Sequence, residues 1–294
     1  MDILVLGGTY FIGKVLVGLL ADKHSVSILN RGTRKSSKNV SLIVADRYNH
    51  SAVEDGLRGK KFDVVIDFSG YNENDVATVL DCLGGRFGHY IFCSSIAVCS
   101  QPPVCWPITE DHAKCTSIKE SEYGYNKWLA EQHLFLYSKK YNIPVSVVRP
   151  VYVYGPYDQS RRIDYFFERI LERQPIIMSG NGENIVQFGY VYDLCQAITS
   201  IIGNKTAHGH VFNISGRELV TINQFLNLVS TVIGVKADAR FDIQDQENQS
   251  TLTDKNRFAD ISKAERVLGI IPETSLIDGI KTTYKWWLTK RRRK

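Results

Sequence analysis

MDILVLGGTYFIG, residues 1–13, is the stretch from which the fold can be predicted most directly. The apolar run Ile3–Leu6 has the length of a buried strand, two glycines follow it, and an apolar periodicity typical of a helix begins at Phe11. The first strand of a parallel sheet has this form. Backbone N–H groups at a glycine turn and a helix N-terminus attract anions, so we expect a dinucleotide pyrophosphate here. The predicted contacts are Gly7, Gly8, Thr9, Tyr10, Phe11, Ile12 and Gly13.

Strand-like and helix-like segments continue to alternate along the chain. Strand-like runs lie at 25–29, 41–44, 62–68, 89–94 and 145–149, each followed by turn residues or a helical pattern. This alternation predicts an α/β protein with a doubly wound parallel sheet of the Rossmann type. The alternation becomes less regular from Gly155, with helices expected at 163–172 and 222–233. We therefore predict a Rossmann domain over residues 1–155 and a smaller C-terminal α/β lobe over residues 156–294.

The composition is that of a globular protein. Of the 294 residues, 44% are hydrophobic and 11% aromatic, which is enough for a large core. The formal net charge of +5 equals the charge of the basic tail, residues 290–294, so the rest of the chain is electrically neutral. The polar stretches 33–39, 101–121 and 242–255 are expected to be loops.

The cysteines and the apolar runs indicate where the protein works. The six cysteines have neither a CxxC spacing nor a histidine at zinc-site distance, so we expect reduced thiols, no metal and a cytoplasmic location. We also expect no secretory leader. No apolar run approaches the roughly 18 residues that a membrane-spanning helix needs. These observations argue against a membrane protein and against a disulfide-stabilised secreted protein.

The end of the second predicted strand indicates which dinucleotide binds. An acidic residue there holds the ribose hydroxyls of NAD, whereas a nearby arginine suits the 2′-phosphate of NADP. Here the strand ends in Asn30-Arg31-Gly32-Thr33-Arg34, which contains no carboxylate. We expect Asn30, Arg31 and Arg34 to contact the cofactor, with NADP as the prediction and NAD as the alternative.

Tyr123 and Lys127 form the candidate catalytic pair. They are four residues apart in a predicted helix over 123–137, so both side chains lie on one helix face. A tyrosine with a pKa of about 10 is a poor base at neutral pH, and a neighbouring cation favours its phenolate. An amphipathic helix with a lysine reaching towards solvent gives the same spacing, so the pair needs further support.

That support comes from a family resemblance. GGTYFIG resembles the GGTGFIG motif of the extended short-chain dehydrogenase/reductase family, whose members are mostly nucleotide-sugar epimerases, dehydratases and reductases. FCSSIAV, residues 92–98, resembles the segment that carries the serine of the family's Ser-Tyr-Lys triad. Ser95 aligns with that serine and Ser94 is the competing candidate. Tyr10 replaces the middle glycine, as in an atypical branch that includes proteins without enzymatic activity.

The resemblance implies further cofactor contacts. Asp46-Arg47 follows the third strand, where an acidic side chain contacts the adenine in relatives. Phe68-Ser69-Gly70 follows the fourth strand and corresponds to residues that line the pyrophosphate and ribose. RPVYVYGP, residues 149–156, resembles the family's RPxNVYGP segment, which implies that Pro150 and Val153 flank the nicotinamide. Tyr123 and Lys127 would contact the cofactor as well, and segments near 188–214 would return to the first domain.

The resemblance is weakest where a substrate should bind. Tyr152 replaces an asparagine that contacts the sugar nucleotide's diphosphate, and Val186-Gln187 replaces an Arg-Asp pair whose arginine usually binds the same group. Arg257 is a second phosphate-binding candidate, just before a segment that matches the family's DxSKAxxxLGxxP pattern. The substrate candidates are Ser95, Tyr152, Gln187 and Arg257.

The resemblance therefore implies an NAD(P)-dependent enzyme that transfers hydride at a sugar carbon of a nucleotide sugar. Ile96-Ala97 stands where dehydratases of the family carry Asp-Glu, which favours epimerase or ketoreductase chemistry. The rival hypothesis is an atypical member that uses the dinucleotide pocket for regulation or binds RNA. A homodimer is common among relatives. We expect the aromatic residues of the last helix to pack on the body, and the basic tail to be solvated and not to bind nucleic acid or acidic lipid.

Overall fold

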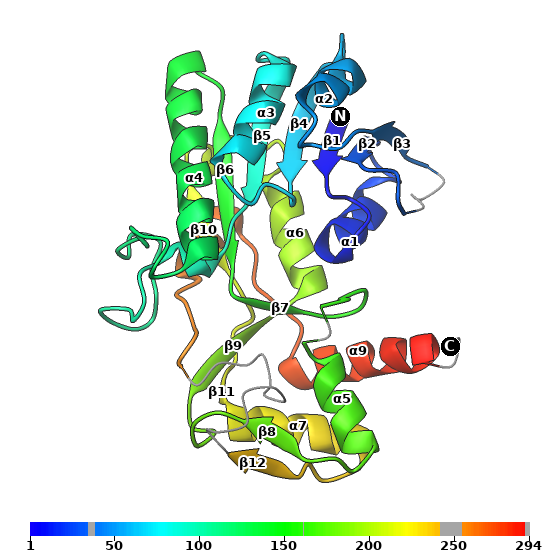
Figure 1. The fold of residues 1–294 in the computed structure, drawn as a ribbon, viewed down its shortest axis with the longest axis vertical. Coiled ribbons are helices and arrows are strands. Elements are labelled where there is room, and N and C mark those ends of the chain that lie inside the picture. The colour runs from blue at the N-terminus through cyan, green and yellow to red at the C-terminus, as the bar shows by residue number, and fades with distance from the viewer. Residues whose placement is uncertain (35–38, 161, 242–254, 292–294) are drawn as a thin grey trace. The chain divides into compact units, whose positions relative to one another are not determined.

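The computed structural model describes residues 1–34, 39–160, 162–241 and 255–291, which form two compact units (Figure 1). Unit 1 comprises Met1–Pro150, Cys195–Ile214 and Asp260–Ile271, and unit 2 comprises Val151–Leu194, Ser215–Ala259 and Pro272–Lys294. The boundary follows Pro150 because this residue still pairs with Ile214 in the first sheet. The segment from Asp260 belongs to unit 1, where the Asp260 N–H donates to the Ile108 carbonyl at 2.9 Å.

Unit 1 contains a seven-stranded sheet in the order β10-β6-β5-β4-β1-β2-β3, with every neighbouring pair parallel. The core of this order, 3-2-1-4-5-6, is that of dinucleotide-binding sheets, so the predicted Rossmann fold is confirmed. Sheets with this order bind ligands at the carboxyl ends of the strands, at the point where the order reverses, which here is between β1 and β4. The strands are β1 (Asp2–Leu6), β2 (Ser25–Asn30), β3 (Ser41–Val44), β4 (Phe62–Asp67), β5 (Phe87–Cys93), β6 (Val145–Pro150) and β10 (Val211–Ile214).

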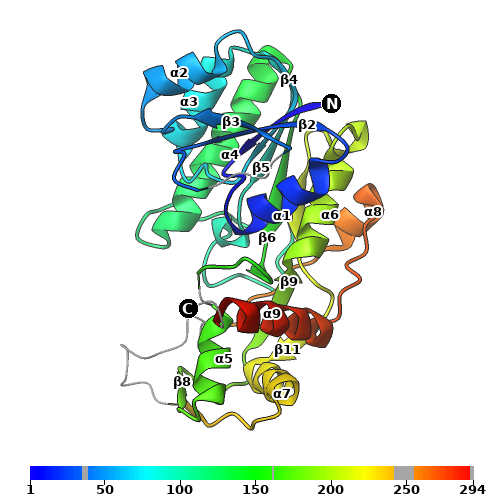
Figure 2. The ribbon, with the colours of Figure 1, turned by 90° about the vertical axis from the view of Figure 1, so that its right-hand side faces the viewer.

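Helices cover both faces of this sheet. In Figure 2, α2, α3 and α4 lie on one face, and α1 and α6 lie on the other. Residues Ile3 to Leu6 of β1 are at most 1% exposed, as a strand covered on both faces requires. The helices are α1 (Phe11–Leu20), α2 (His50–Leu57), α3 (Glu73–Leu83), α4 (Glu122–Tyr141), α6 (Val191–Ile201) and α8 (Ser262–Leu268), with short 3₁₀ helices η1 (Ile96–Val98) and η2 (Lys205–Ala207).

Unit 2 has its own aromatic core and two small sheets. One sheet has the order β11-β9-β7, and the other pairs β12 with β8. Phe188 stacks on Phe225 with ring centroids 4.6 Å apart, and Phe166 meets the same Phe225 ring edge-on at 5.1 Å. The elements are β7 (Tyr152–Tyr154), α5 (Asp164–Leu171), β8 (Ile176–Met178), β9 (Ile185–Tyr190), β11 (Leu219–Thr221), α7 (Ile222–Ile233), β12 (Ala239–Phe241) and α9 (Leu276–Arg291).

Several sequence expectations can be compared with this fold. The stretch 101–121 contains no helix or strand, as predicted for a loop. Leu276, Ile280 and Trp287 of α9 are buried in the core of unit 2, which agrees with the expected docking face. The predicted loop over 242–255, apart from Lys255, lies outside the described residues, and so do residues 292–294 of the basic tail and residues 35–38.

All six cysteines are free, and only Cys105 is exposed. Among the residues described here, no helix is long and apolar enough to cross a membrane. The same residues contain no cluster of three or more His, Cys, Asp or Glu side chains suited to a metal ion.

Candidate active site

The turn between β1 and α1 is closed by two glycines. Gly7 has a φ of +84°, which L side chains rarely adopt, and a Cβ at Gly13 would lie 2.4 Å from the Gly7 carbonyl oxygen. Tyr10 has a φ of −128°, an extended value that any residue adopts, so a side chain is tolerated where the family's turn has a glycine. Tyr10 is 40% exposed. The tight packing of helix on turn is what a pyrophosphate site at a helix N-terminus requires.

The polar residues at the end of β2 divide into two kinds. The Asn30 side chain is partly buried and bonds to its own surroundings: its Nδ2 donates to Thr9 Oγ1 at 3.1 Å and its Oδ1 accepts from the Gly32 N–H at 2.7 Å. Arg31 and Arg34 are exposed, and the Arg34 guanidinium lies 4.7 Å from the centroid of the Tyr10 ring. The structure therefore brings two cations to the carboxyl end of β2, close to the glycine turn.

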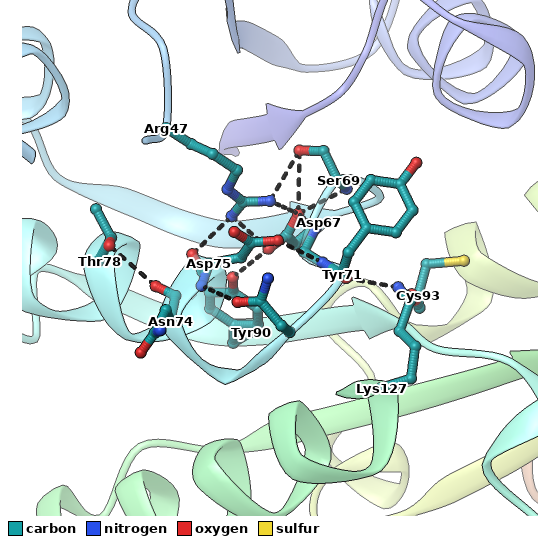
Figure 3. Close-up of polar contacts among 12 residues, drawn as sticks. Arg47, Asp67, Ser69, Tyr71, Asn74, Asp75, Thr78, Tyr90, Cys93 and Lys127 are labelled. Carbon is teal, nitrogen blue, oxygen red and sulfur yellow. Dashed lines mark hydrogen bonds and ion pairs between the residues drawn. The ribbon is translucent and has the colours of Figure 1, made fainter. Parts of the chain in front are cut away.

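A buried ion pair lies at the end of β4 (Figure 3). The Arg47 guanidinium donates to both carboxylate oxygens of Asp67, at 3.2 and 2.9 Å, and to Ser69 Oγ at 3.0 Å. The Tyr90 hydroxyl donates to the same carboxylate at 2.8 Å, and Arg47 also donates to the Asp75 carbonyl at 3.0 Å. The hydrogen bonds of Arg47 are thus directed into the protein, and contact with a cofactor stays a prediction for Arg47, as it does for the neighbouring Asp46.

The two charges stabilise each other against the cost of burial. Burial disfavours both charged forms, yet the pKa of Arg47 is raised by Asp67. The pKa of Asp67 is lowered by the charge and hydrogen bonds of Arg47 and by the Tyr90 hydroxyl, although burial opposes that shift. Sequence reasoning missed Asp67 and Tyr90 as parts of this site. The signal was an aspartate at the end of the apolar strand FDVVID, since a buried carboxylate needs a cationic or hydrogen-bonding partner.

Lys127 is fixed by the carboxyl ends of two neighbouring strands. Its Nζ donates to the Gly70 carbonyl at 2.6 Å, just after β4, and to the Cys93 carbonyl at 2.7 Å, the last residue of β5. The ammonium also lies 4.6 Å from the centroid of the Phe92 ring. The residue is 2% exposed, and burial lowers its pKa. The lysine is therefore an internal cation at the crevice end of the sheet and not a surface residue of an amphipathic helix.

The start of α4 brings Tyr123 to this edge of the sheet. The helix begins after Ser121, whose hydroxyl accepts from the Gly124 N–H at 3.0 Å. A Cβ at Gly124 would lie 2.0 Å from the Ala97 carbonyl oxygen, so the first turn of α4 packs directly on η1. Tyr123 is 45% exposed. One turn of helix separates it from the buried Lys127.

The two serine candidates differ in their surroundings. Ser95 caps η1, and its hydroxyl oxygen accepts from the Ala97 N–H at 3.2 Å, which leaves the hydroxyl proton able to point elsewhere. Ser94 is 3% exposed, and its Oγ has no hydrogen-bond partner within the described part of the chain. The structure thus places Ser95, Tyr123 and Lys127 at one end of the sheet, all within unit 1.

The substrate candidates of unit 2 lie along β9. Gln187 is buried, and both ends of its amide are used internally: Nε2 donates to the Gly216 carbonyl at 2.7 Å and Oε1 accepts from the Ala259 N–H at 2.9 Å. Arg257 lies beside β9 in an isolated β-bridge with Val186, and its N–H donates to the Ile185 carbonyl at 2.8 Å. The internal hydrogen bonds of Gln187 are those of a structural residue, and substrate contact stays a prediction for it.

Arg257 lies within electrostatic range of a second arginine, Arg162. The Arg162 guanidinium lies 5.5 Å from the centroid of the Tyr152 ring, which itself packs edge-on against Phe188. Burial lowers the pKa of Arg257, the Tyr152 phenol opposes that shift, and the charge of Arg162 adds to it. Sequence reasoning missed Arg162, since nothing in the local pattern distinguishes it from a solvated surface arginine.

The two residues expected beside the nicotinamide lie in different units. Pro150 is the last residue of β6 in unit 1, and Val153 is a buried residue of β7 in unit 2. Each is held by strand pairing, Pro150 with Ile214 and Val153 with Gly189. Their joint role stays a prediction.

Comparison with known proteins decides the family. The sequence profile of the NAD dependent epimerase/dehydratase family matches residues 3–215, which is more than half of the chain. The chain belongs to this family. A curated relative is the chloroplast stem-loop binding protein of 41 kDa b of Arabidopsis thaliana, 29% identical over 96% of this chain and 78% of its own length. Another is the putative UDP-glucose 4-epimerase of Methanocaldococcus jannaschii, 26% identical over 99% of both chains.

A solved structure supports the same fold for this family member. It is that of UDP-glucuronic acid 4-epimerase from Bacillus cereus in complex with UDP-glucuronic acid and NAD. It matches with a TM-score of 0.83 at 22% identity, and covers 99% of this chain and 100% of that chain. The similarity in fold extends over both units.

Proposed function

We propose that this protein is an NAD(P)-dependent enzyme that transfers hydride at a sugar carbon of a nucleotide sugar, as an epimerase or a ketoreductase. The observation that carries the proposal is the buried Lys127 ammonium, bound to the carbonyls of Gly70 and Cys93, with Tyr123 one helical turn before it. Membership of the NAD dependent epimerase/dehydratase family supports it, and so do a putative UDP-glucose 4-epimerase among the relatives and a UDP-glucuronic acid 4-epimerase of the same fold.

The proposed chemistry assigns one task to each side chain. Tyr123 takes the proton of the sugar hydroxyl during oxidation and returns it during reduction. The Lys127 cation favours the phenolate form of Tyr123 by electrostatic attraction. The Ser95 hydroxyl donates a hydrogen bond to the reacting sugar oxygen and holds it near Tyr123. A bound nicotinamide supplies the hydride acceptor.

The residues of unit 1 fit a dinucleotide. A side chain would be strained at Gly7 by its φ of +84°, and at Gly13 it would collide with the Gly7 carbonyl, so the turn is left to backbone N–H groups that can approach a pyrophosphate. The family and the solved structure point to NAD. The exposed Arg31 and Arg34 at the end of β2, with no carboxylate between them, support NADP as the preferred form in this chain.

The residues of unit 2 fit the diphosphate of a nucleotide sugar. Arg257 and Arg162 lie near enough for one charge to shift the other's pKa, and a diphosphate between them would relieve that repulsion. Arg162 would then take the role of the arginine that the family carries at the position of Val186 in this chain. On this proposal unit 1 binds the cofactor, unit 2 binds the substrate, and the enzyme works in the cytoplasm as a homodimer.

The test is to identify bound molecules and turnover with purified protein. Mass spectrometry of the gently purified chain should detect a co-purified dinucleotide. Incubation with UDP-sugars, with UDP-4-keto sugars and with NAD, NADP or their reduced forms should give an epimer or a reduced sugar, detected by chromatography. Tyr123→Phe is the inactive control. If the protein bound a stem-loop RNA and turned over no sugar, the result would contradict the proposal and favour the RNA-binding hypothesis. That hypothesis is the weaker candidate because Ser95, Tyr123 and Lys127 are all present.

A further inference from the structure

The peptide that accepts the hydrogen bond from Lys127 is itself held on both sides by carboxylates (Figure 3). Asp67 Oδ1 accepts from the N–H groups of Ser69 and Gly70 at 2.8 and 2.9 Å. Asp75 Oδ2 accepts from the Tyr71 N–H at 2.7 Å, and this N–H belongs to the same peptide unit as the Gly70 carbonyl. The lysine is thus linked to two buried acids through one turn of backbone.

Arg47 joins the two acids. Its guanidinium binds the Asp67 carboxylate and the Asp75 carbonyl, so it fixes the first acid directly and the second through the backbone. We call Arg47, Asp67 and Asp75 the β4 clamp. Asp67 is 0% exposed and Asp75 is 3% exposed, so water does not replace these contacts easily.

The space around the clamped turn leaves little freedom. A Cβ at Gly70 would lie 2.8 Å from Asp67 Oδ2 and 3.0 Å from the Phe92 ring. A hydrogen bond between fixed partners in a buried site is stronger than one to a mobile acceptor, because no ordering is needed when it forms. The position of the Gly70 carbonyl therefore depends on the clamp.

We propose that the β4 clamp positions Lys127, by fixing the Gly70 carbonyl and by setting the charge that surrounds the ammonium. Arg47, Asp67 and Asp75 are then positioning residues for the proposed Ser95-Tyr123-Lys127 site, and to that extent the inference rests on the proposed function. They are not expected to touch the substrate. This role explains why buried charges lie behind a turn that could otherwise be built from small apolar residues.

The proposal can be tested by the direction in which the pKa of Lys127 shifts when one charge of the clamp is removed. Four side chains influence the pKa of Lys127: Cys93 of β5, Asp67 of β4, Glu131 of α4, and Arg47, which precedes α2. The centroid of the Tyr71 ring lies 5.3 Å from the Lys127 Nζ. After burial, which lowers the pKa of Lys127, Asp67 raises it and Arg47 lowers it. Removing one member of the pair should therefore shift the pKa of Lys127 in the opposite direction to removing the other.

The experiment is an NMR titration of the Lys127 side chain in protein labelled with ¹³C and ¹⁵N lysine, without cofactor or substrate. The signal is assigned by its loss in Lys127→Met. Asp67→Asn should lower the pKa of Lys127, Arg47→Met should raise it, and the double variant should return it to near the wild-type value. Tyr90→Phe is the matched control, since it removes one hydrogen bond to Asp67 without changing a charge, and it should leave the pKa close to wild type.

Shifts of the same sign in both single variants, or no shift in either, would overturn the proposal, because a purely structural network would only change stability. If one single variant does not fold, the other carries the test: Asp67→Asn should lower the pKa of Lys127 and Arg47→Met should raise it, and an unchanged value in the variant that folds would overturn the proposal. The titration needs no turnover, so the two proposals can fail separately. Absence of turnover on any sugar would refute the proposed function, and opposite pKa shifts in the same protein would still support the clamp.

Discussion

The proposed catalytic residues of unit 1 and the substrate candidates of unit 2 are held in different ways. In unit 1, Lys127 is bound by backbone carbonyls and Ser95 caps a short helix, so the expected residues are fixed by the fold itself. In unit 2, the amide of the expected Gln187 is used inside the protein, whereas the charge of Arg162 reaches Arg257 and lowers its pKa. On the proposed function, the proton-transferring residues are held by the backbone of the fold, and we infer that the substrate side has been rebuilt with residues that differ from the family's.

This difference has a physical reason. A proton-transferring group must be held to within fractions of an ångström, and backbone acceptors at the ends of parallel strands give that precision. A diphosphate is a large, multiply charged group that any pair of suitably placed arginines can bind. Loss of the family's arginine at Val186 therefore need not abolish substrate binding, provided that another cation lies within reach.

The largest effect is expected at Tyr123. Tyr123→Phe should lower kcat by about a hundredfold or more, because it removes the oxygen that transfers the proton. The ring is kept and is partly exposed, so the melting temperature and the cofactor Kd should change little. Stopped-flow measurement of nicotinamide absorbance compares the two proteins over a panel of nucleotide sugars. Turnover of the variant at the wild-type rate would remove Tyr123 from the mechanism.

Two glycines of α1 test how tightly the cofactor turn is built. Gly13→Ala places a Cβ 2.4 Å from the Gly7 carbonyl oxygen, and should destabilise the fold by about 3 kcal/mol and weaken dinucleotide binding. Gly18→Ala is the matched control, since a Cβ there has no atom within 4 Å, and it should stabilise the fold by about 0.5–1 kcal/mol. Urea denaturation measures both. Similar effects of the two substitutions would mean that the turn is not closely packed.

The cofactor preference is tested at the end of β2. Arg31→Asp should weaken NADP binding relative to NAD by roughly tenfold to a hundredfold, because it removes charge-assisted hydrogen bonds worth about 1.5–3 kcal/mol. Both dinucleotides are titrated against wild type and variant, at low and high salt. Equal affinity of the wild type for NAD and NADP would contradict the preference, whatever the variant does.

Much of unit 1 could be predicted from sequence, because its determinants are local. The apolar runs and glycines of the first thirteen residues specify a strand, a turn and a helix, and the four-residue spacing of Tyr123 and Lys127 places them on one helix face. The strand at Ser41–Val44 and the helix at Ile222–Ile233 were predicted with the bounds that the structure has. Periodicity and turn chemistry act over a few residues, and one sequence is enough to detect them.

The buried network behind the site could not be predicted, because its partners are distant in the chain. Arg47 and Asp67 are twenty residues apart, and Tyr90 meets Asp67 only because β4 and β5 are neighbours in the sheet. The same reason hid Arg162 from sequence reasoning, since its relation to Arg257 depends on the folding of unit 2. Long-range pairing of charges is a property of the tertiary structure and leaves little trace in a local pattern.

The smallest expected effects concern these two arginines, and they test whether the substrate side has been rebuilt as described above. Arg257→Met should raise KM for a nucleotide sugar about tenfold, and Arg162→Met should raise it by a few-fold, because Arg162 is more exposed and its charge is better screened. The value of kcat should stay close to wild type in both, since the diphosphate is bound equally in the ground state and the transition state.

Arg169→Met is the matched control for Arg162→Met. The Arg169 guanidinium lies 5.5 Å from the centroid of the Tyr165 ring, the same cation–ring distance as in the Arg162–Tyr152 pair, but on α5. Its loss removes one cation–π contact of the same kind without removing a proposed phosphate ligand, so KM should not change. If Arg169→Met raised KM as much as Arg162→Met did, the effect would belong to the net charge of unit 2. Normal KM in Arg257→Met would mean that the diphosphate binds elsewhere, because a half-buried cation in contact with it could not be removed without a loss of affinity.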